Sequence, residues 1–209
     1  MKSVFDEFSE RYDLWYERHK YAYLSEIKAV EKVIPEKGEG LEIGVGTGRF
    51  ASPLGIRYGI DPSEKMLEIA KKRGIKVKVG KGENLPFEDE EFDYVAIIIS
   101  FCFVENPEKV IKESNRVLKK NGKIIIGIVP RDSFLGKYYI SKDSIFYRYA
   151  NFFTVEEVVK TLEKNGFSNF SFYQTIFTLP DEMEKEDEVI EGYDKGGFVV
   201  ISAIKTENT

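Results

Sequence analysis

Hydrophobic residues recur along the chain with two alternating spacings, one typical of strands and the other of helices. Seven segments have the apolar content or alternation of strands: 41–43, 56–60, 75–79, 92–99, 124–126, 167–178 and 198–204. Four segments carry apolar residues on one helical face: 24–33, 62–73, 106–118 and 154–162. A further helix is expected after the glycines that follow residue 43. The pattern predicts five strand–helix alternations followed by a pair of strands.

This order predicts an α/β fold class. We expect a doubly wound, mostly parallel seven-stranded sheet with an antiparallel C-terminal edge, inside a three-layer α/β/α sandwich. The run 92–99 lacks polar alternation, which suits a central strand buried on both faces. Thr154 to Glu157 has the pattern of a capping box, so a helix should begin there.

Composition narrows the function classes. The chain has 209 residues with a formal net charge of -5, one Cys and one His, so it has no disulfide framework, and we expect no metal site. The acidic balance argues against a nucleic-acid partner that relies on an overall positive field. The longest near-apolar run, 94–104, is 11 residues against the roughly 20 of a membrane-spanning helix. We see no targeting segment, and expect a cytoplasmic protein with no membrane insertion.

The negative charge is concentrated in one segment. Residues 181–195, between the last two predicted strands, hold eight acidic and two basic residues. We expect a solvated connection whose charges discourage edge-to-edge strand pairing. The alternative is electrostatic selection of a cationic substrate or partner.

The segment with the clearest chemistry runs from Glu42 to Gly48. Its glycines follow a strand and should open a helix, where a ligand can lie against exposed backbone N–H groups. Glu42 puts a carboxylate beside this loop. Asp61 ends the second strand, where an acidic side chain can accept both hydroxyls of a ribose. The simpler alternatives are a tight β–α turn for the glycines and a helix N-cap ahead of Pro62 for Asp61.

The spacing of the glycines separates two cofactors. A dinucleotide fingerprint starting at Gly44 and Gly46 would need a third glycine where Arg49 stands. The observed pattern is instead Glu-x-Gly-x-Gly-x-Gly. A pyrophosphate would meet repulsion from Glu42, whereas a ligand carrying an ammonium and a sulfonium would be attracted.

On these residues the chain resembles the class I S-adenosylmethionine (SAM)-dependent methyltransferases, especially the small-molecule branch, over roughly 38–130. Further matching stretches are Pro62-Ser63-x-x-Met66-Leu67, Gly82-Glu83-Asn84-Leu85-Pro86-Phe87, Phe92-Asp93-Tyr94-Val95 and Arg116-Val117-Leu118-Lys119-x-x-Gly122. The resemblance implies SAM as cofactor. It also implies a binding site made of Tyr12, Glu42, Gly44, Gly46, Gly48, Asp61, Pro62, Met66, Gly82, Glu83, Asn84, Ser100 and Phe101.

Within that site the resemblance implies a division of roles. Glu42 and the glycine loop would hold the methionine part of SAM, Asp61 the ribose and Gly82-Glu83 the adenine. Ser100 and Phe101 would border the transferred methyl group, and Tyr12 belongs to an N-terminal Tyr-Asp signature.

The sequence also departs from the family, and no catalytic residue is named. Lys81 stands where relatives often carry an acidic residue, and Cys102 where many carry a His. The flanking phenylalanines favour a buried, inert thiol at Cys102. His19 and Glu105 lie in polar runs, so a surface position is the simpler interpretation for both.

Aromatic residues are dense in 5–23 and 134–153, which in the family usually cover the pocket. We therefore divide one methyltransferase domain into an N-terminal helical cap (1–35), a SAM-binding core (38–130), a substrate lid (131–153) and a C-terminal helix with antiparallel strands (154–209). The predicted activity is methyl transfer to a small or medium-sized molecule. The acceptor atom (N, O, S or C) and the oligomeric state stay open. The alternatives are a nicotinamide-dependent oxidoreductase and a non-catalytic SAM-binding assembly or regulatory protein.

Overall fold

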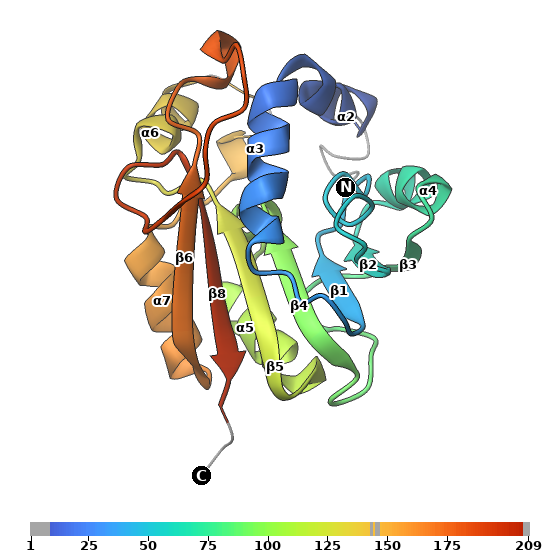
Figure 1. Ribbon diagram of the computed structural model, residues 1–209. Coiled ribbons are helices and arrows are strands. Elements are labelled where there is room, and N and C mark those ends of the chain that lie inside the picture. The colour runs from blue at the N-terminus through green and yellow to red at the C-terminus, as the bar shows by residue number, and fades with distance from the viewer. Residues whose placement is uncertain (1–8, 143, 145–146, 207–209) are drawn as a thin grey trace.

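One mixed sheet forms the centre of the molecule (Figure 1). The computed structural model describes residues 9–142, 144 and 147–206, and within them eight strands lie in the order β3-β2-β1-β4-β5-β8-β6-β7. The strands are β1 (Gly40–Ile43), β2 (Tyr58–Asp61), β3 (Lys76–Val79), β4 (Phe92–Ile98), β5 (Leu118–Ile128), β6 (Phe167–Thr175), β7 (Ile190–Glu191) and β8 (Phe198–Lys205). Neighbouring strands from β3 to β5 are parallel, whereas β8 is antiparallel to β5 and to β6. The predicted mostly parallel sheet with an antiparallel C-terminal edge is confirmed.

Helices cover both faces of this sheet. They are α2 (Ser9–Arg18), α3 (Lys20–Glu31), α4 (Glu64–Lys72), α5 (Pro107–Val117), α6 (Phe134–Ser141) and α7 (Val155–Lys164). Short 3-10 turns are η1 (Ser100–Phe103), η2 (Tyr147–Tyr149) and η3 (Pro180–Glu182). Buried side chains of α2, α3, α4 and α6 share one hydrophobic cluster, and those of α5 and α7 share the other. The three-layer sandwich is thereby confirmed.

The helix starts follow from local side-chain chemistry. The Thr154 hydroxyl accepts from the Glu157 N–H while the Glu157 carboxylate accepts from the Thr154 N–H, so the predicted capping box is present. In α4 the N-cap is Ser63, whose hydroxyl accepts from the Met66 N–H. Asp61 was the alternative N-cap in the sequence interpretation. Asp61 lies two residues before this N-cap, and its carboxylate accepts a hydrogen bond from the Gly46 N–H of the glycine loop.

The helix expected after the glycine loop does not form. Residues 44–56 follow consecutive turns instead, with two helix-like bonds, from the Ser52 N–H to the Gly48 carbonyl and from the Leu54 N–H to the Phe50 carbonyl. Gly48 and Gly55 have φ of +81° and +69°, so the backbone leaves right-handed helical geometry at both ends of this short segment. The prediction of a helix here was wrong because those glycines and Pro53 leave too few residues for two helical turns.

Every residue of the acidic connection 181–195 is half-buried or exposed, as expected of a solvated connection, and the segment is also fastened to the rest of the protein. Its residues 190–191 form β7, a strand that the prediction of seven strands missed, which pairs with β6. Glu186 makes an ion pair with Lys28, and the Asp187 N–H donates to the Ser25 hydroxyl at 2.9 Å, so the connection is fastened to α3. It leaves an acidic strand at this edge of the sheet, as the edge-protection interpretation expects.

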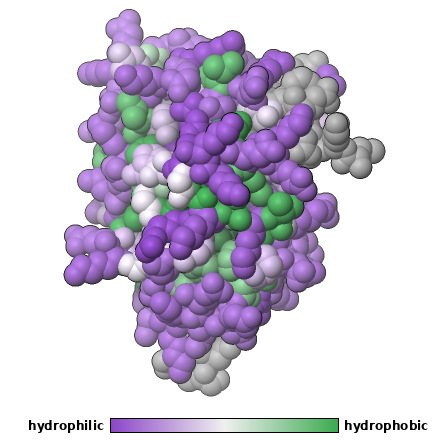
Figure 2. Space-filling model, turned by 90° about the vertical axis from the view of Figure 1, so that its right-hand side faces the viewer, coloured by the Kyte–Doolittle hydropathy of each residue, from purple (hydrophilic) through white to green (hydrophobic). Residues whose placement is uncertain are grey.

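The outer surface agrees with this layering. On the side of α4 and β3 the surface is mostly polar, with apolar residues gathered in one central patch (Figure 2). Among the described residues, no helix has the length and apolar character needed to cross a membrane.

Candidate active site

The glycine loop joins β1 to the turns that lead into β2. Gly44, Gly46 and Gly48 all have positive φ. A Cβ on Gly44 would lie 2.4 Å from the Ser100 Cβ, so the end of β4 approaches the loop too closely for any side chain there. The Asp61 carboxylate fixes the loop from β2, because its Oδ2 accepts from the Gly46 N–H at 3.0 Å. Its Oδ1 accepts from the Ser63 N–H at 2.9 Å.

Glu42 lies under this loop with its carboxyl group buried. The side chain belongs to a residue only 1% exposed, and within the described part of the chain its Oε2 has no hydrogen-bond partner. Burial raises the pKa of Glu42 well above its ordinary value, and the nearby charge of Asp61 acts in the same direction, whereas a bond from the Ala51 N–H opposes it. A buried carboxyl without a partner on one oxygen suits a cationic ligand group.

The turn at 81–84 lies beside the same strand ends. Gly82 is buried, and a Cβ there would lie 2.7 Å from the Ile43 Cγ2. The Glu83 Oε1 accepts from the N–H groups of Glu105 and Asn106, at 2.9 and 3.1 Å. Lys81, the departure noted in the sequence, pairs with Glu105 at 2.6 Å. Glu83 therefore holds the loop before α5, while Asn84 and Pro62 are exposed.

The end of β4 turns sharply at Ile99. This β-branched residue has a φ of +63°, a strained conformation that redirects the chain into η1. The Ser100 hydroxyl donates to the Ile43 carbonyl at 2.8 Å and thereby ties β4 to β1. Phe101, which the resemblance put beside the methyl group, is 1% exposed in the α5–α7 cluster, with its ring centroid 5.3 Å from that of Phe153. Phe101 therefore points into the core.

Helix α2 is fastened to the glycine loop by Asp13. Arg49 donates to its carboxylate through Nε and Nη2, at 2.8 and 2.6 Å, and Arg73 through Nη1 and Nη2, both at 2.9 Å. The Thr47 hydroxyl adds a fifth bond at 2.6 Å. Burial works against the charge of Asp13, but the bonds from Arg73, Arg49 and Thr47 outweigh it and hold the pKa below its usual range.

The same clamp brings Tyr12 to the loop. A Cβ on Gly46 would lie 3.9 Å from the Tyr12 Cε1 and 3.8 Å from the Met66 sulfur, so the two side chains flank this glycine. The Tyr12 hydroxyl lies 2.8 Å from that of Tyr16, inside the aromatic cluster of α2. The structure thus brings Tyr12, Met66 and Asp61 together around Gly46.

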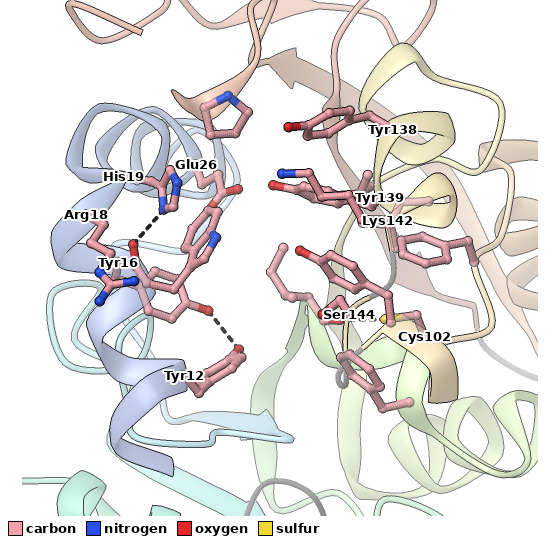
Figure 3. Close-up of a pocket in the computed structure, with 18 of the residues that line it drawn as sticks. Tyr12, Tyr16, Arg18, His19, Glu26, Cys102, Tyr138, Tyr139, Lys142 and Ser144 are labelled. Carbon is pink, nitrogen blue, oxygen red and sulfur yellow. Dashed lines mark hydrogen bonds between the residues drawn. The ribbon is translucent and has the colours of Figure 1, made fainter. Parts of the chain in front are cut away.

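Beyond Tyr12 lies a cavity of about 300 Å³ (Figure 3). One wall comes from α2 and α3 and includes Tyr12, Trp15, Tyr16, His19 and Glu26. The other comes from residues 99–103, 128–142, 144 and 147–153 and includes Ile99, Cys102, Tyr138, Tyr139, Tyr147 and Phe152. Of the predicted cofactor residues only Tyr12 lines it, so the cavity adjoins the glycine loop and is separate from it.

Most polar groups of the cavity stay uncharged at neutral pH. Burial raises the pKa of Tyr12, Tyr16, Tyr139 and Tyr147 far above the ordinary value of a phenol. Burial also raises the pKa of the Cys102 thiol to about 12, in agreement with the inert thiol predicted there. These groups can donate hydrogen bonds, but they do not accept a proton.

Two residues of this cavity were missed or set aside at the level of sequence. Glu26 is 4% exposed, and burial raises its pKa to about 8. Figure 3 shows its carboxyl projecting from α3 toward the wall that carries Tyr139. His19, expected on the surface, lines the cavity, and its ring stacks on Trp15 with 4.5 Å between centroids.

Comparison with known proteins supplies the class. Residues 41–126 match the family model described as a methyltransferase domain. The chain is 30% identical over 211 residues to the demethylmenaquinone methyltransferase of Thermotoga maritima, covering 84% of this chain and 91% of that protein. A Thermotoga maritima crystal structure, described as a SAM-dependent methyltransferase and possible histamine N-methyltransferase, has a TM-score of 0.95 and 48% identity, covering 99% of this chain and 100% of that one. An uncharacterized protein of Methanocaldococcus jannaschii is 55% identical over 205 residues, 97% of this chain and 99% of that protein.

The chain belongs to the class I SAM-dependent methyltransferases. The predicted fold and enzyme class are confirmed, and the nicotinamide-dependent alternative is set aside.

Proposed function

We propose that this enzyme methylates a small molecule held in the tyrosine-lined cavity, with SAM lying across the carboxyl ends of β1, β2 and β4. The observation that carries the proposal is the pairing of Asp61 with the Gly46 N–H, in the loop that follows Glu42, whose buried Oε2 has no partner among the described residues. A cofactor with an amino group, a sulfonium and a ribose has complementary groups for each of these. The residues present therefore fit SAM.

Each residue has a proposed role. SAM, when bound, supplies a methyl group on a positively charged sulfur. The buried Glu42 carboxyl attracts the cationic end, and the open glycine loop lets the backbone approach it. Asp61 accepts from the N–H groups of Gly46 and Ser63, and these bonds hold its carboxylate at the strand end, where it would meet the ribose hydroxyls. The turn of Gly82, Glu83 and Asn84 borders the adenine.

The remaining predicted residues position these groups. Ser100 ties β4 under the loop, Tyr12 and Met66 flank Gly46, and Pro62 begins the turn after Asp61. Phe101 acts from the core, by packing behind η1. The role given to it in the sequence interpretation passes to Ile99 and Cys102, which line the cavity on that segment.

A lid built from two distant segments covers the acceptor. The cavity is lined from α2–α3 on one side and by residues 138–142, 144 and 147–153 on the other, which supports the division into helical cap and substrate lid. Methyl transfer from a sulfonium requires close alignment and the exclusion of water more than acid–base help. Aromatic walls on both sides provide that dry environment.

Calorimetric titration with S-adenosylhomocysteine tests the cofactor site. We expect measurable binding to the wild type and to Glu68→Ala, which alters an exposed acid of α4. Asp61→Ala should reduce affinity at least tenfold, because the loop and the ribose both lose their acceptor. Equal affinity of Asp61→Ala and the wild type, or no binding by the folded wild type, would overturn the proposal.

A further inference from the structure

Glu26 differs from the other acidic residue of the cavity, Asp181, because one oxygen of its buried carboxyl group has no partner among the described residues. In the part of the chain that the structure describes, its Oε2 has no hydrogen-bond partner, and the residue is only 4% exposed. A carboxyl group this deeply buried is costly to keep unless something pairs with it. Its neighbours in the cavity wall are mostly rings, so no described residue supplies the missing partner, whereas a ligand in the cavity can.

The other charged groups around the cavity are already paired or exposed to water. Both ring nitrogens of His19 face acceptors, Nδ1 the Trp15 carbonyl and Nε2 the Asp181 Oδ1, each at 2.9 Å. Both ring nitrogens of His19 are therefore engaged by groups of the protein itself. Lys142 lies 3.7 Å from the Asp181 Oδ2, and Arg11 and Arg18 are exposed.

We propose that Glu26 binds the nucleophilic amino group of the methyl acceptor, so that the acceptor is a small amine carrying an apolar or aromatic body. The inference rests on the proposed function, since it names the substrate class of the same enzyme. The aromatic walls can make two kinds of favourable contact with such a molecule. Their ring faces attract an ammonium group by cation–π interaction, and their surfaces enclose its apolar body. Trp15 of α2 and Tyr139 of α6 both line the cavity and supply such ring faces.

The reaction balances with Glu26 as the proton acceptor. The amine enters as an ammonium ion and passes one proton to the Glu26 carboxylate, which exposes the nitrogen lone pair. That pair forms the bond to the methyl carbon while the carbon–sulfur bond breaks and its electrons stay on sulfur. The products are the methylated ammonium ion and S-adenosylhomocysteine. Glu26 keeps this proton when the products leave, because its pKa of about 8 makes the protonated form its resting state at pH 7. The one proton lost for each methyl group transferred is the proton that Glu26 releases when the ammonium ion binds.

The surroundings of Glu26 leave it as the titrating group near neutral pH. The groups that face it are Tyr12 and Tyr16 of α2, Tyr23 of α3, Tyr139 of α6, Tyr147 of η2 and Cys102 of η1, with His19, Lys142 and Asp181 at the rim. Burial raises the pKa of the tyrosines and of the thiol, so none of those ionises below pH 9. Because Glu26 has a pKa of about 8, binding an ammonium ion at pH 7 should ionise it and release a proton.

The test uses 2-phenylethylamine as probe and the neutral 2-phenylethanol as its shape-matched control. The chain has one Trp, and Trp15 lines the cavity, so its fluorescence reports occupancy directly. We expect the amine to change the Trp15 emission at concentrations where the alcohol does not. Glu26→Gln should reduce the affinity for the amine roughly 30-fold or more, because the ion pair between the buried carboxylate and the ammonium group is lost. Glu31→Gln, the same change at an exposed position of α3, should leave the affinity unchanged.

Proton release gives a second readout that does not depend on turnover. Calorimetry of the amine at pH 7 in two buffers of different ionisation enthalpy should show release of about one proton for the wild type and for Glu31→Gln, and none for Glu26→Gln. Equal binding of amine and alcohol, or wild-type amine affinity in Glu26→Gln, would overturn the inference. If S-adenosylhomocysteine still binds in those samples, the proposed function survives and only the acceptor class falls.

Discussion

The Asp13 carboxylate and the Arg49 guanidinium form a two-point ion pair that joins α2 to the glycine loop, with Nη2–Oδ2 and Nε–Oδ1 distances of 2.6 and 2.8 Å. Arg73, at the end of α4, forms an ion pair with the same carboxylate. One acid thus connects three segments that lie far apart in the sequence. The position of Tyr12 over Gly46 depends on this connection.

Asp13→Asn should therefore destabilise the protein and loosen the cofactor site together. The change leaves two guanidinium groups without their shared anion, and we expect a loss of about 2–3 kcal/mol, below the cost for a fully buried pair because the side chain is partly exposed. Urea denaturation at pH 7 measures it. Glu17→Gln is the matched control, because Glu17 also pairs with Arg49 but is 62% exposed, so its loss should stay under about 0.5 kcal/mol. Equal losses in the two variants would contradict the clamp.

Glu26→Gln should change the pH dependence of stability. Burial raises the pKa of Glu26 from 4.5 to about 8, so the folded state binds more protons than the unfolded state between those values. The stability of the wild type should fall as the pH rises through this window, whereas the variant lacks that contribution. Between pH 4.5 and pH 8.5, the free energy of unfolding of the variant should increase relative to that of the wild type by on the order of 4 kcal/mol. Urea denaturation at both pH values measures the gain, and a constant difference would mean that Glu26 is already charged and paired.

Gly44→Ala should be much more damaging than Gly55→Ala. Both glycines have positive φ, +71° and +69°, so both substitutions incur the cost of left-handed geometry, about 1–2 kcal/mol. A Cβ at Gly55 meets no atom within 4 Å, but at Gly44 it collides with Ser100. We expect Gly44→Ala to lose a further 1–3 kcal/mol and its affinity for S-adenosylhomocysteine. Thermal denaturation and calorimetry measure both quantities, and identical behaviour of the two variants would refute the role of the close approach.

The cofactor half of the site could be proposed from the sequence because its signals are local. The glycine spacing, the acid before it and Asp61 at a strand end all lie within about 20 residues. The same local reasoning misjudged Phe101, since a residue in a 3-10 turn after a strained Ile99 can point to either side of the sheet. The orientation of that turn depends on packing against Phe153, which is distant in sequence.

The acceptor half could not be predicted in the same way. Asp13 meets Arg49 and Arg73 across 36 and 60 residues, and no spacing rule connects them. Glu26 did leave a signal, because residues 23, 26, 30 and 33 fall on one helical stripe and the others there are Tyr or Val. A charged residue inside an apolar stripe indicates either a buried partner or a ligand. Choosing between them required the cavity and its other wall.

Transfer of labelled methyl groups tests the central claim most directly. The protein is incubated at pH 8 with methyl-labelled SAM and either 2-phenylethylamine or 2-phenylethanol, and the products are separated. We predict label on the nitrogen of the amine, none on the alcohol, and a loss of at least tenfold in Glu26→Gln while S-adenosylhomocysteine binding is retained. Label on the alcohol at an equal rate, or no labelled amine from a protein that binds S-adenosylhomocysteine, would contradict the account.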